Sequence, residues 1–205
     1  MNWQAQIIEQ RCIVLLQDTN ERMRIPLDEG GRFRLIAPDS NSVQNLVAAL
    51  EELSAVGVLV ANGGLLGAKT VAENFAIVLH YGTDARDNIT TEWEDTLNTA
   101  LRLAGMSDER IASIGRELPM NLSRTERWLL GFVRCVLRPP ELLVFDRIFS
   151  GLTRREAEAL VALETIFHEF HPFRPVLFVD LDTHELPVIR DCRQEFHIEE
   201  SSCLC

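Results

Sequence analysis

Residues 122–152 constrain the fold of this chain more than any other part of its sequence. They open on Ser123, a good helix N-cap, and Glu126 follows three positions later in the spacing of a capping box. Apolar residues then recur at helical spacing up to Pro139, which cannot continue a helix. The short apolar run of residues 142–145 comes next and predicts a buried strand.

This apolar run ends on Asp146. In open α/β sheets, ligands bind outside the carboxyl ends of the strands, so an acidic residue at this position points to a ligand site. Asp146 therefore stands where an open α/β sheet would place its ligand chemistry.

The order of these parts resembles the signature helix, Walker B strand and D-loop of ABC transporter ATPases. In that family LSGGQ precedes an arginine-rich helix, a proline, an apolar strand ending in Asp-Glu, and SGLD. Here Arg147 stands in place of the glutamate, and residues 150–153 read Ser-Gly-Leu-Thr. The signature-like residues are Leu122, Ser123, Arg124, Thr125 and Glu126.

The resemblance covers about residues 5–200 and implies one ABC ATPase-like domain over residues 1–205. The implied fold is P-loop NTPase-like, with a mainly parallel sheet flanked by helices. A helical subdomain at about residues 72–138 would be inserted in the α/β core, and the antiparallel subdomain would be reduced.

A turn after the expected strand at residues 33–36 corresponds to the P-loop, G-x-x-x-x-G-K-[ST]. The glycines of a P-loop let backbone N–H groups converge on phosphates, and its lysine offsets phosphate charge. Here Ala37 replaces the first glycine and Val43 the lysine. The nucleotide-binding positions that the resemblance marks, all degenerate, are Ser40, Asn41, Ser42, Val43, Gln44, Asn45 and Asp146.

Other catalytic groups of the family are also replaced. Residues 61–62 (Ala-Asn) stand where the Q-loop glutamine belongs, and Leu181 stands at the switch histidine, with His184 expected to cap or pack. Phosphoryl transfer depends on positioning and charge stabilisation, and losing one such group costs roughly two to four orders of magnitude in rate. We therefore expect a pseudo-ATPase with no catalytic residues, no metal and no ATP or Mg²⁺ cofactor.

The resemblance also implies partners. ABC ATPases work as dimers that grip a permease, and a copy without catalytic groups can still supply that grip. We expect a non-catalytic subunit or regulator of a membrane transport complex, bound to a permease subunit or to an ABC ATPase partner, either itself or an active paralogue. The alternative is a nucleotide-binding, non-hydrolysing partner that uses the loop amides and Arg147.

Residues 62–79 resemble the Q-loop region of the ATPases in Mla/Mce-type lipid transporters, where TV-x-ENVA-x-PL follows a segment of small residues. Lipid transport is therefore the expected cargo class. The spacing of Thr70 and Glu73 also suits a plain capping box, so helix initiation explains part of the match.

A different class of function rests on Asp180 and Asp182. With Thr183 they resemble the D-x-D motif of haloacid-dehalogenase phosphatases, in which two carboxylates after a strand bind Mg²⁺. In that family the motif opens the chain, whereas here it comes late. A Mg²⁺-dependent phosphatase is the remote alternative.

Composition and charge exclude other classes. The net charge of −11 argues against a nucleic-acid partner, because a polyphosphate would be repelled. No apolar run approaches the roughly 20 residues of a membrane span, and the start lacks the layout of a secretory signal. We expect a cytoplasmic protein, or one peripheral at the inner face of the cell membrane through its partner.

The remaining signals are local. Arginines at 124, 127, 134 and 138 predict a solvated helix face, and five scattered cysteines, including Cys203 and Cys205, predict reduced thiols without a second pair for zinc. The other elements expected are one or two strands in residues 3–16, strands at 57–61, 175–179 and 195–198, and helices at 43–53, 84–117 and 153–170.

Overall fold

The computed structural model describes residues 2–82, 97–99, 101–102, 106–137, 140–149, 152–181 and 191–198. The elements in chain order are β1 (Trp3–Ile8), β2 (Cys12–Gln17), β3 (Asn20–Pro26), β4 (Arg32–Ala37), α1 (Ser40–Glu51), β5 (Val56–Val60), α2 (Val71–Gly82), α4 (Asp108–Ile114), the 3-10 helix η1 (Pro119–Asn121), α5 (Arg124–Leu137), β6 (Leu142–Asp146), α6 (Arg154–Phe170), β7 (Val176–Leu181) and β8 (Gln194–His197).

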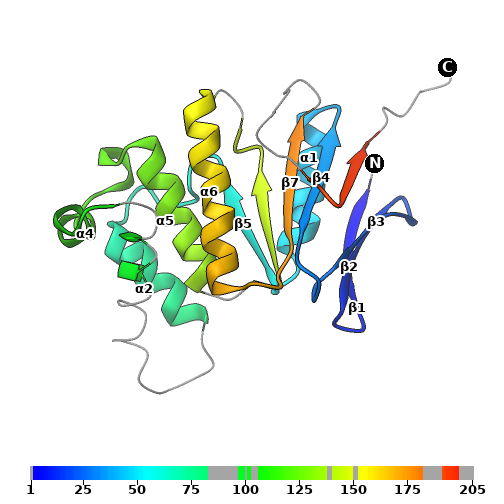
Figure 1. Ribbon diagram of the computed structural model, residues 1–205, viewed down its shortest axis with the longest axis horizontal. Helices are drawn as coiled ribbons and strands as arrows, with labels where there is room; N and C mark the ends of the chain where they lie inside the picture. The colour runs from blue at the N-terminus through cyan, green and yellow to red at the C-terminus, as the bar shows by residue number, and fades with distance from the viewer. Residues whose placement is uncertain are drawn as a thin grey trace.

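A five-stranded sheet in the order β5-β6-β7-β4-β8 forms the centre of the molecule (Figure 1). All four strand pairs are parallel, so the five carboxyl ends lie at one edge of the sheet. The expected α/β fold with a parallel sheet is confirmed.

Two hydrophobic cores lie on opposite faces of this sheet, and β6 and β7 contribute to both. Leu143 and Phe145 of β6 pack with α5 and α6, whereas Leu142 and Val144 pack with α1. Successive residues of a strand point to opposite faces, so a strand buried on both sides must be apolar throughout. This explains why residues 142–145 form a continuous apolar run.

The three-stranded antiparallel sheet β1-β2-β3 packs on the α1 side of the molecule (Figure 1). The sequence did not predict the third strand of this sheet, β3. Neither of the two turns that connect the three strands contains the glycine that usually marks a hairpin. Glu9 and Gln10 have φ values of 52° and 57°, and Asp18 and Thr19 have 47° and 73°. These are two-residue turns with positive φ at both positions, as right-handed strand twist requires.

The local helix signals were largely correct. Thr153 and Glu156 form a reciprocal capping box at the start of α6, and Ser123 and Glu126 do so at the start of α5. The helices expected over residues 84–117 are described only in part, since residues 83–96, 100 and 103–105 lie outside the described residues. None of the described helices is long and apolar enough to span a bilayer.

The hypothesis of a solvated arginine face on α5 was wrong for the arginines that the structure describes. Arg134 donates to the carbonyl oxygen of Gly64, and Arg124 lies over the buried Trp128 ring, 4.8 Å from its centroid. Arg127 is half-buried, and Arg138 lies outside the described residues. The helix face therefore packs against the segment that follows β5.

This packing brings two backbones into direct contact. A Cβ atom on Gly131 of α5 would overlap the carbonyl oxygen of Gly63, and one on Gly63 would overlap the carbonyl oxygen of Arg127. Gly63 also has a φ of +79°, which side-chain-bearing residues rarely adopt. Glycine is therefore required at both positions for α5 to reach its place on the sheet.

We expect Gly131→Ala to lower the free energy of unfolding by about 1–3 kcal/mol in urea denaturation, because the added methyl group overpacks the contact. Helix propensity alone predicts the opposite sign, since alanine is favoured over glycine in a helix by roughly 0.8–1.0 kcal/mol. Gly67→Ala is the matched control, because a Cβ atom there has nothing within 4 Å. A Gly131→Ala variant more stable than the wild type would contradict the contact.

Candidate functional site

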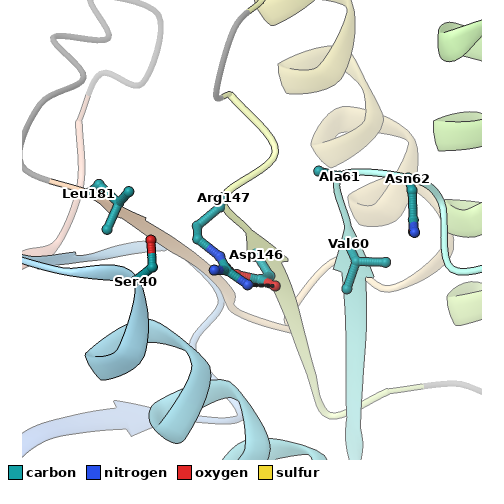
Figure 2. A pocket seen from close by; sticks show the side chains of 7 residues that line it. All are labelled: Ser40, Val60, Ala61, Asn62, Asp146, Arg147 and Leu181. Atoms are coloured by element: carbon teal, nitrogen blue, oxygen red, sulfur yellow. Dashed lines mark hydrogen bonds and ion pairs between the residues drawn. The ribbon is translucent and has the colours of Figure 1, made fainter.

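An open pocket of about 510 Å³ lies at the carboxyl ends of the parallel strands (Figure 2). It is formed where α1 begins and where β5, β6 and β7 end, as the sheet topology predicts. Four of its seven lining residues have polar or charged side chains. The lining residues are Ser40, Val60, Ala61, Asn62, Asp146, Arg147 and Leu181.

The N-terminus of α1 is capped by Asp39. Its carboxylate accepts hydrogen bonds from the backbone N–H groups of Asn41 (2.8 Å) and Ser42 (3.0 Å) and from the Ser42 hydroxyl (2.6 Å). The bond from the Ser42 hydroxyl, followed by those from the backbone, lowers the pKa of Asp39. Two of the backbone donors that this helix N-terminus offers to an anion are thus engaged by the chain's own carboxylate.

This cap also corrects the expected helix boundary. The helix was expected to begin near Val43, but it begins at Ser40, so the loop after β4 is only two residues long. Val43 and Ser42 point into the interior, with exposed fractions of 0% and 5%, whereas Asn41, Gln44 and Asn45 are exposed. Of the seven nucleotide-binding positions marked from the sequence, the structure brings only Ser40 and Asp146 to the pocket.

Asp146 is paired with the residue that follows it. Arg147 Nε lies 2.8 Å from Oδ1 and Nη2 lies 3.1 Å from Oδ2, a bidentate ion pair with Asp146 only 5% exposed (Figure 2). This hydrogen bonding, opposed by partial burial and supported by the nearby Asp180 charge, raises the pKa of Arg147. The pocket therefore contains a carboxylate that already has a permanent counter-ion.

The signature-like residues lie away from the described pocket and have structural contacts. Leu122 is buried, and Ser123 and Glu126 cap α5. Glu126 also accepts a 2.6 Å hydrogen bond from Arg110 of α4. Thr125 is exposed.

The segment after β5 is tied down by two helices. Ala61 accepts a 2.5 Å hydrogen bond from the Trp128 indole of α5. Asn74 of α2, 3% exposed, binds both backbone groups of Leu66 and donates to the carbonyl oxygens of residues 69 and 70. Thr70 and Glu73 form the capping box that their spacing indicated. The Mla/Mce-like sequence pattern here thus coincides with residues that fix a loop.

The structure places only half of the phosphatase motif. Asp180 is 1% exposed in β7, and its Oδ1 accepts a hydrogen bond from the Leu181 N–H. Asp182 and Thr183, like Ser150, Gly151, Cys203 and Cys205, lie outside the described residues. Within the described residues, no three His, Cys, Asp or Glu side chains come together as a metal site.

Sequence comparison relates the chain to methionine import ATP-binding proteins. MetN 2 of Paraburkholderia xenovorans (strain LB400) is 31% identical over 136 residues, 66% of this chain and 32% of that protein. MetN of Vibrio cholerae serotype O1 is 25% identical over 144 residues, 70% of this chain and 38% of that protein. The chain thus spans about a third of the length of these relatives. No family model matches the chain.

Solved structures agree with the fold. The ATP-binding cassette MJ0796, in a dimeric post-hydrolysis state bound to ADP and Pi, has a TM-score of 0.63 at 14% identity, covering 97% of this chain and 92% of that chain. The chain has the fold of an ABC transporter ATP-binding domain. CbiO1 from Clostridium perfringens, part of the ABC transporter complex cbiONQ, has a TM-score of 0.56 at 10% identity, covering 89% and 80%.

The residues of this ABC ATPase-like domain do not fit a magnesium nucleotide. The chain has one lysine, Lys69, which precedes α2 in the sequence. Its Nζ lies 3.5 Å from Oε1 of Glu73 in that helix. Asp39 accepts from two of the backbone N–H groups at the start of α1, and Arg147 is paired with the Asp146 carboxylate. A phosphate group at the start of α1 would be repelled by the Asp39 carboxylate. A metal cation at the end of β6 would be repelled by the Arg147 guanidinium.

Sequence reasoning missed the role of Asp39. The signal was present, because aspartate is among the preferred N-caps and stands directly before residues 40–42. The P-loop pattern drew attention to positions 37 and 43 instead, where its glycine and lysine belong. Local capping chemistry would have placed the helix start correctly.

We expect Asp39→Ala to lower the free energy of unfolding by about 1 kcal/mol at pH 7, as for other lost caps. Because the folded-state pKa of Asp39 is lowered, its charge stabilises the fold above the ordinary value of 3.8, and this contribution is lost as pH falls through the folded-state pKa. The stability difference between the wild type and Asp39→Asn should therefore shrink below about pH 4. A difference independent of pH would show that the cap is not ionised.

Proposed function

We propose that this chain is a non-catalytic ABC ATPase-like subunit or regulator of a membrane transport complex. The observation that carries the proposal is the ion pair between Asp146 and Arg147 in the pocket, at the positions that correspond to the Walker B Asp-Glu pair. An arginine here reverses the charge at the position of the residue that would orient water. In this proposal the chain is a pseudo-ATPase, a protein with the ATPase fold that does not hydrolyse ATP.

The chemistry of hydrolysis supports this reading. The transferred phosphoryl group needs a cation to neutralise developing charge and a polar residue to orient the attacking water. Around this pocket, Leu181 is apolar where the switch histidine would stand. Ala61 and Asn62 stand at the Q-loop glutamine, and the side-chain oxygen of Asn62 accepts a hydrogen bond from the Gly64 N–H. With the lysine and the glutamate also replaced, the site retains Asp146 but lacks the P-loop lysine and the water-orienting residue on which fast phosphoryl transfer depends.

A role as a binding partner is supported by what the fold keeps intact. Between β5 and β6, α2 and α5 pack on each other and on the segment after β5 through Asn74, Trp128 and Arg134. The relatives are named import ATP-binding proteins, and one structural match is dimeric. A permease subunit and an ABC ATPase dimer partner are the proposed partners, which would place the chain at the inner face of the cell membrane.

Two cargo classes are supported by different observations. The Mla/Mce-like pattern of residues 62–79 supports lipid transport. The names of the sequence relatives support methionine import instead. Because loop packing explains Asn74 and capping explains Thr70 and Glu73, the pattern is a weaker argument than it was from sequence alone. The two classes differ in the permease that would co-purify.

We expect neither millimolar Mg-ATP nor Mg-ADP to raise the melting temperature of the purified chain, and we expect no phosphate release. A ligand at 100 times its Kd would add about 2.7 kcal/mol, which is roughly 5–10 °C for a chain of this size. MetN 2 of Paraburkholderia xenovorans is the positive control in both assays. A clear shift without phosphate release would favour the nucleotide-binding, non-hydrolysing alternative, and phosphate release would overturn the proposal.

The partner proposal predicts a specific surface. Leu66 is 53% exposed and Met120 is 75% exposed, and both lie on segments bonded to the first turn of α2. We expect Leu66→Asp and Met120→Asp to reduce the amount of permease that co-purifies with the tagged chain from its native cells by at least about tenfold, because about 1.4 kcal/mol suffices for that change.

Phe173→Asp is the matched control for this experiment. Phe173 is 70% exposed but precedes β7, at the amino ends of the strands. Equal loss of permease in all three variants would contradict the surface. A lipid-transport permease or a methionine permease in the wild-type sample, identified by mass spectrometry, would decide the cargo.

A further inference from the structure

The ion pair of Asp146 and Arg147 depends on an unusual backbone conformation. Neighbouring residues of a strand point to opposite faces, so a strand would hold these two side chains apart. Arg147 instead has a φ of +46°, in the left-handed region, at the point where β6 ends. Its N–H donates to the Val179 carbonyl oxygen at 2.9 Å, which fixes the turn against β7.

The turn folds the guanidinium back over the preceding carboxylate, as Figure 2 shows. A non-glycine residue in the left-handed region is disfavoured, because its Cβ atom lies too close to the following carbonyl oxygen. Such local strain persists only when the surrounding structure determines it, and it clusters at functional sites. Here it converts two adjacent side chains into a bidentate pair.

The Asp146 carboxylate needs such a partner because it is nearly inaccessible to water. A buried carboxylate without a counter-ion is strongly disfavoured, and the pocket around it supplies the apolar side chains of Val60 and Leu181. Arginine is always charged, and its planar fork matches the two carboxylate oxygens. The pair therefore holds this edge of the sheet in one charge state.

We propose that Arg147 is the resident cation of this edge, occupying with its guanidinium the coordination side of Asp146 that a divalent ion would otherwise use. This deepens the proposed function, since it names what fills the cation position of the site. Divalent cations then do not bind Asp146 at the carboxyl edge of the sheet. The charge pairing of Asp146 does not change with the concentration of nucleotide.

The test uses Mn²⁺ without nucleotide and three variants. In Arg147→Met the cation is removed, in Arg147→Lys the charge is kept, and in Asp146→Asn/Arg147→Met both charges are removed. We expect Arg147→Met to lose stability and to regain part of it with millimolar Mn²⁺, as a rise in melting temperature of roughly 3 °C. The wild type, Arg147→Lys and the double variant should show no rise.

If Arg147→Met does not fold, Arg147→Gln replaces it, because the amide can still donate to the carboxylate. A folded, charge-free variant at position 147 without a Mn²⁺ response would overturn the proposal, as would a wild-type response of equal size. An equal Mn²⁺ response in the double variant would overturn it too, because Asp146 would then not be the ligand. The absence of ATP binding is measured separately and would stand in each of these cases.

Discussion

The burial of β6 on both faces is the constraint on which the rest of the structure depends. Leu143 and Phe145 join the core under α5 and α6, and Leu142 and Val144 join the core over α1, so one strand ties the two cores together. Such a strand can carry a charge only at its end. Asp146 therefore stands at the carboxyl edge, where the chain from β5, β7 and α1 also arrives.

Polar groups at and beside the candidate site are bonded within the chain itself. Asp39 accepts from two backbone N–H groups and the Ser42 hydroxyl at the start of α1, and Arg147 pairs with the carboxylate at the end of β6. In an active site of this fold, a nucleotide phosphate would bind at the start of α1 and a metal cation at the end of β6. The chain keeps the ABC ATPase-like fold, and these polar groups of the site are bonded to one another within the chain.

Sequence reasoning succeeded where a signal is local. The capping boxes at Ser123 and Thr153 are defined within four residues, so spacing alone predicts them. It failed where the deciding contact is distant or the residue type is unusual. The arginine stripe of α5 read as solvated, although Arg134 bonds a carbonyl of the segment after β5, and β3 was missed because Asp18 and Thr19 make a turn usually made with glycine.

The sequence by itself determined the buried strand that ends on Asp146, through its apolar run, and the α/β class, through the resemblance to ABC ATPases. The replacement of the family's catalytic residue types was inferred from the same resemblance. Only the tertiary structure decided what the replacements do. Whether Arg147 faces solvent or Asp146 depends on one backbone angle at the end of β6. Whether Gly131 is a helix defect or a contact depends on Gly63, which is remote in sequence and adjacent in space.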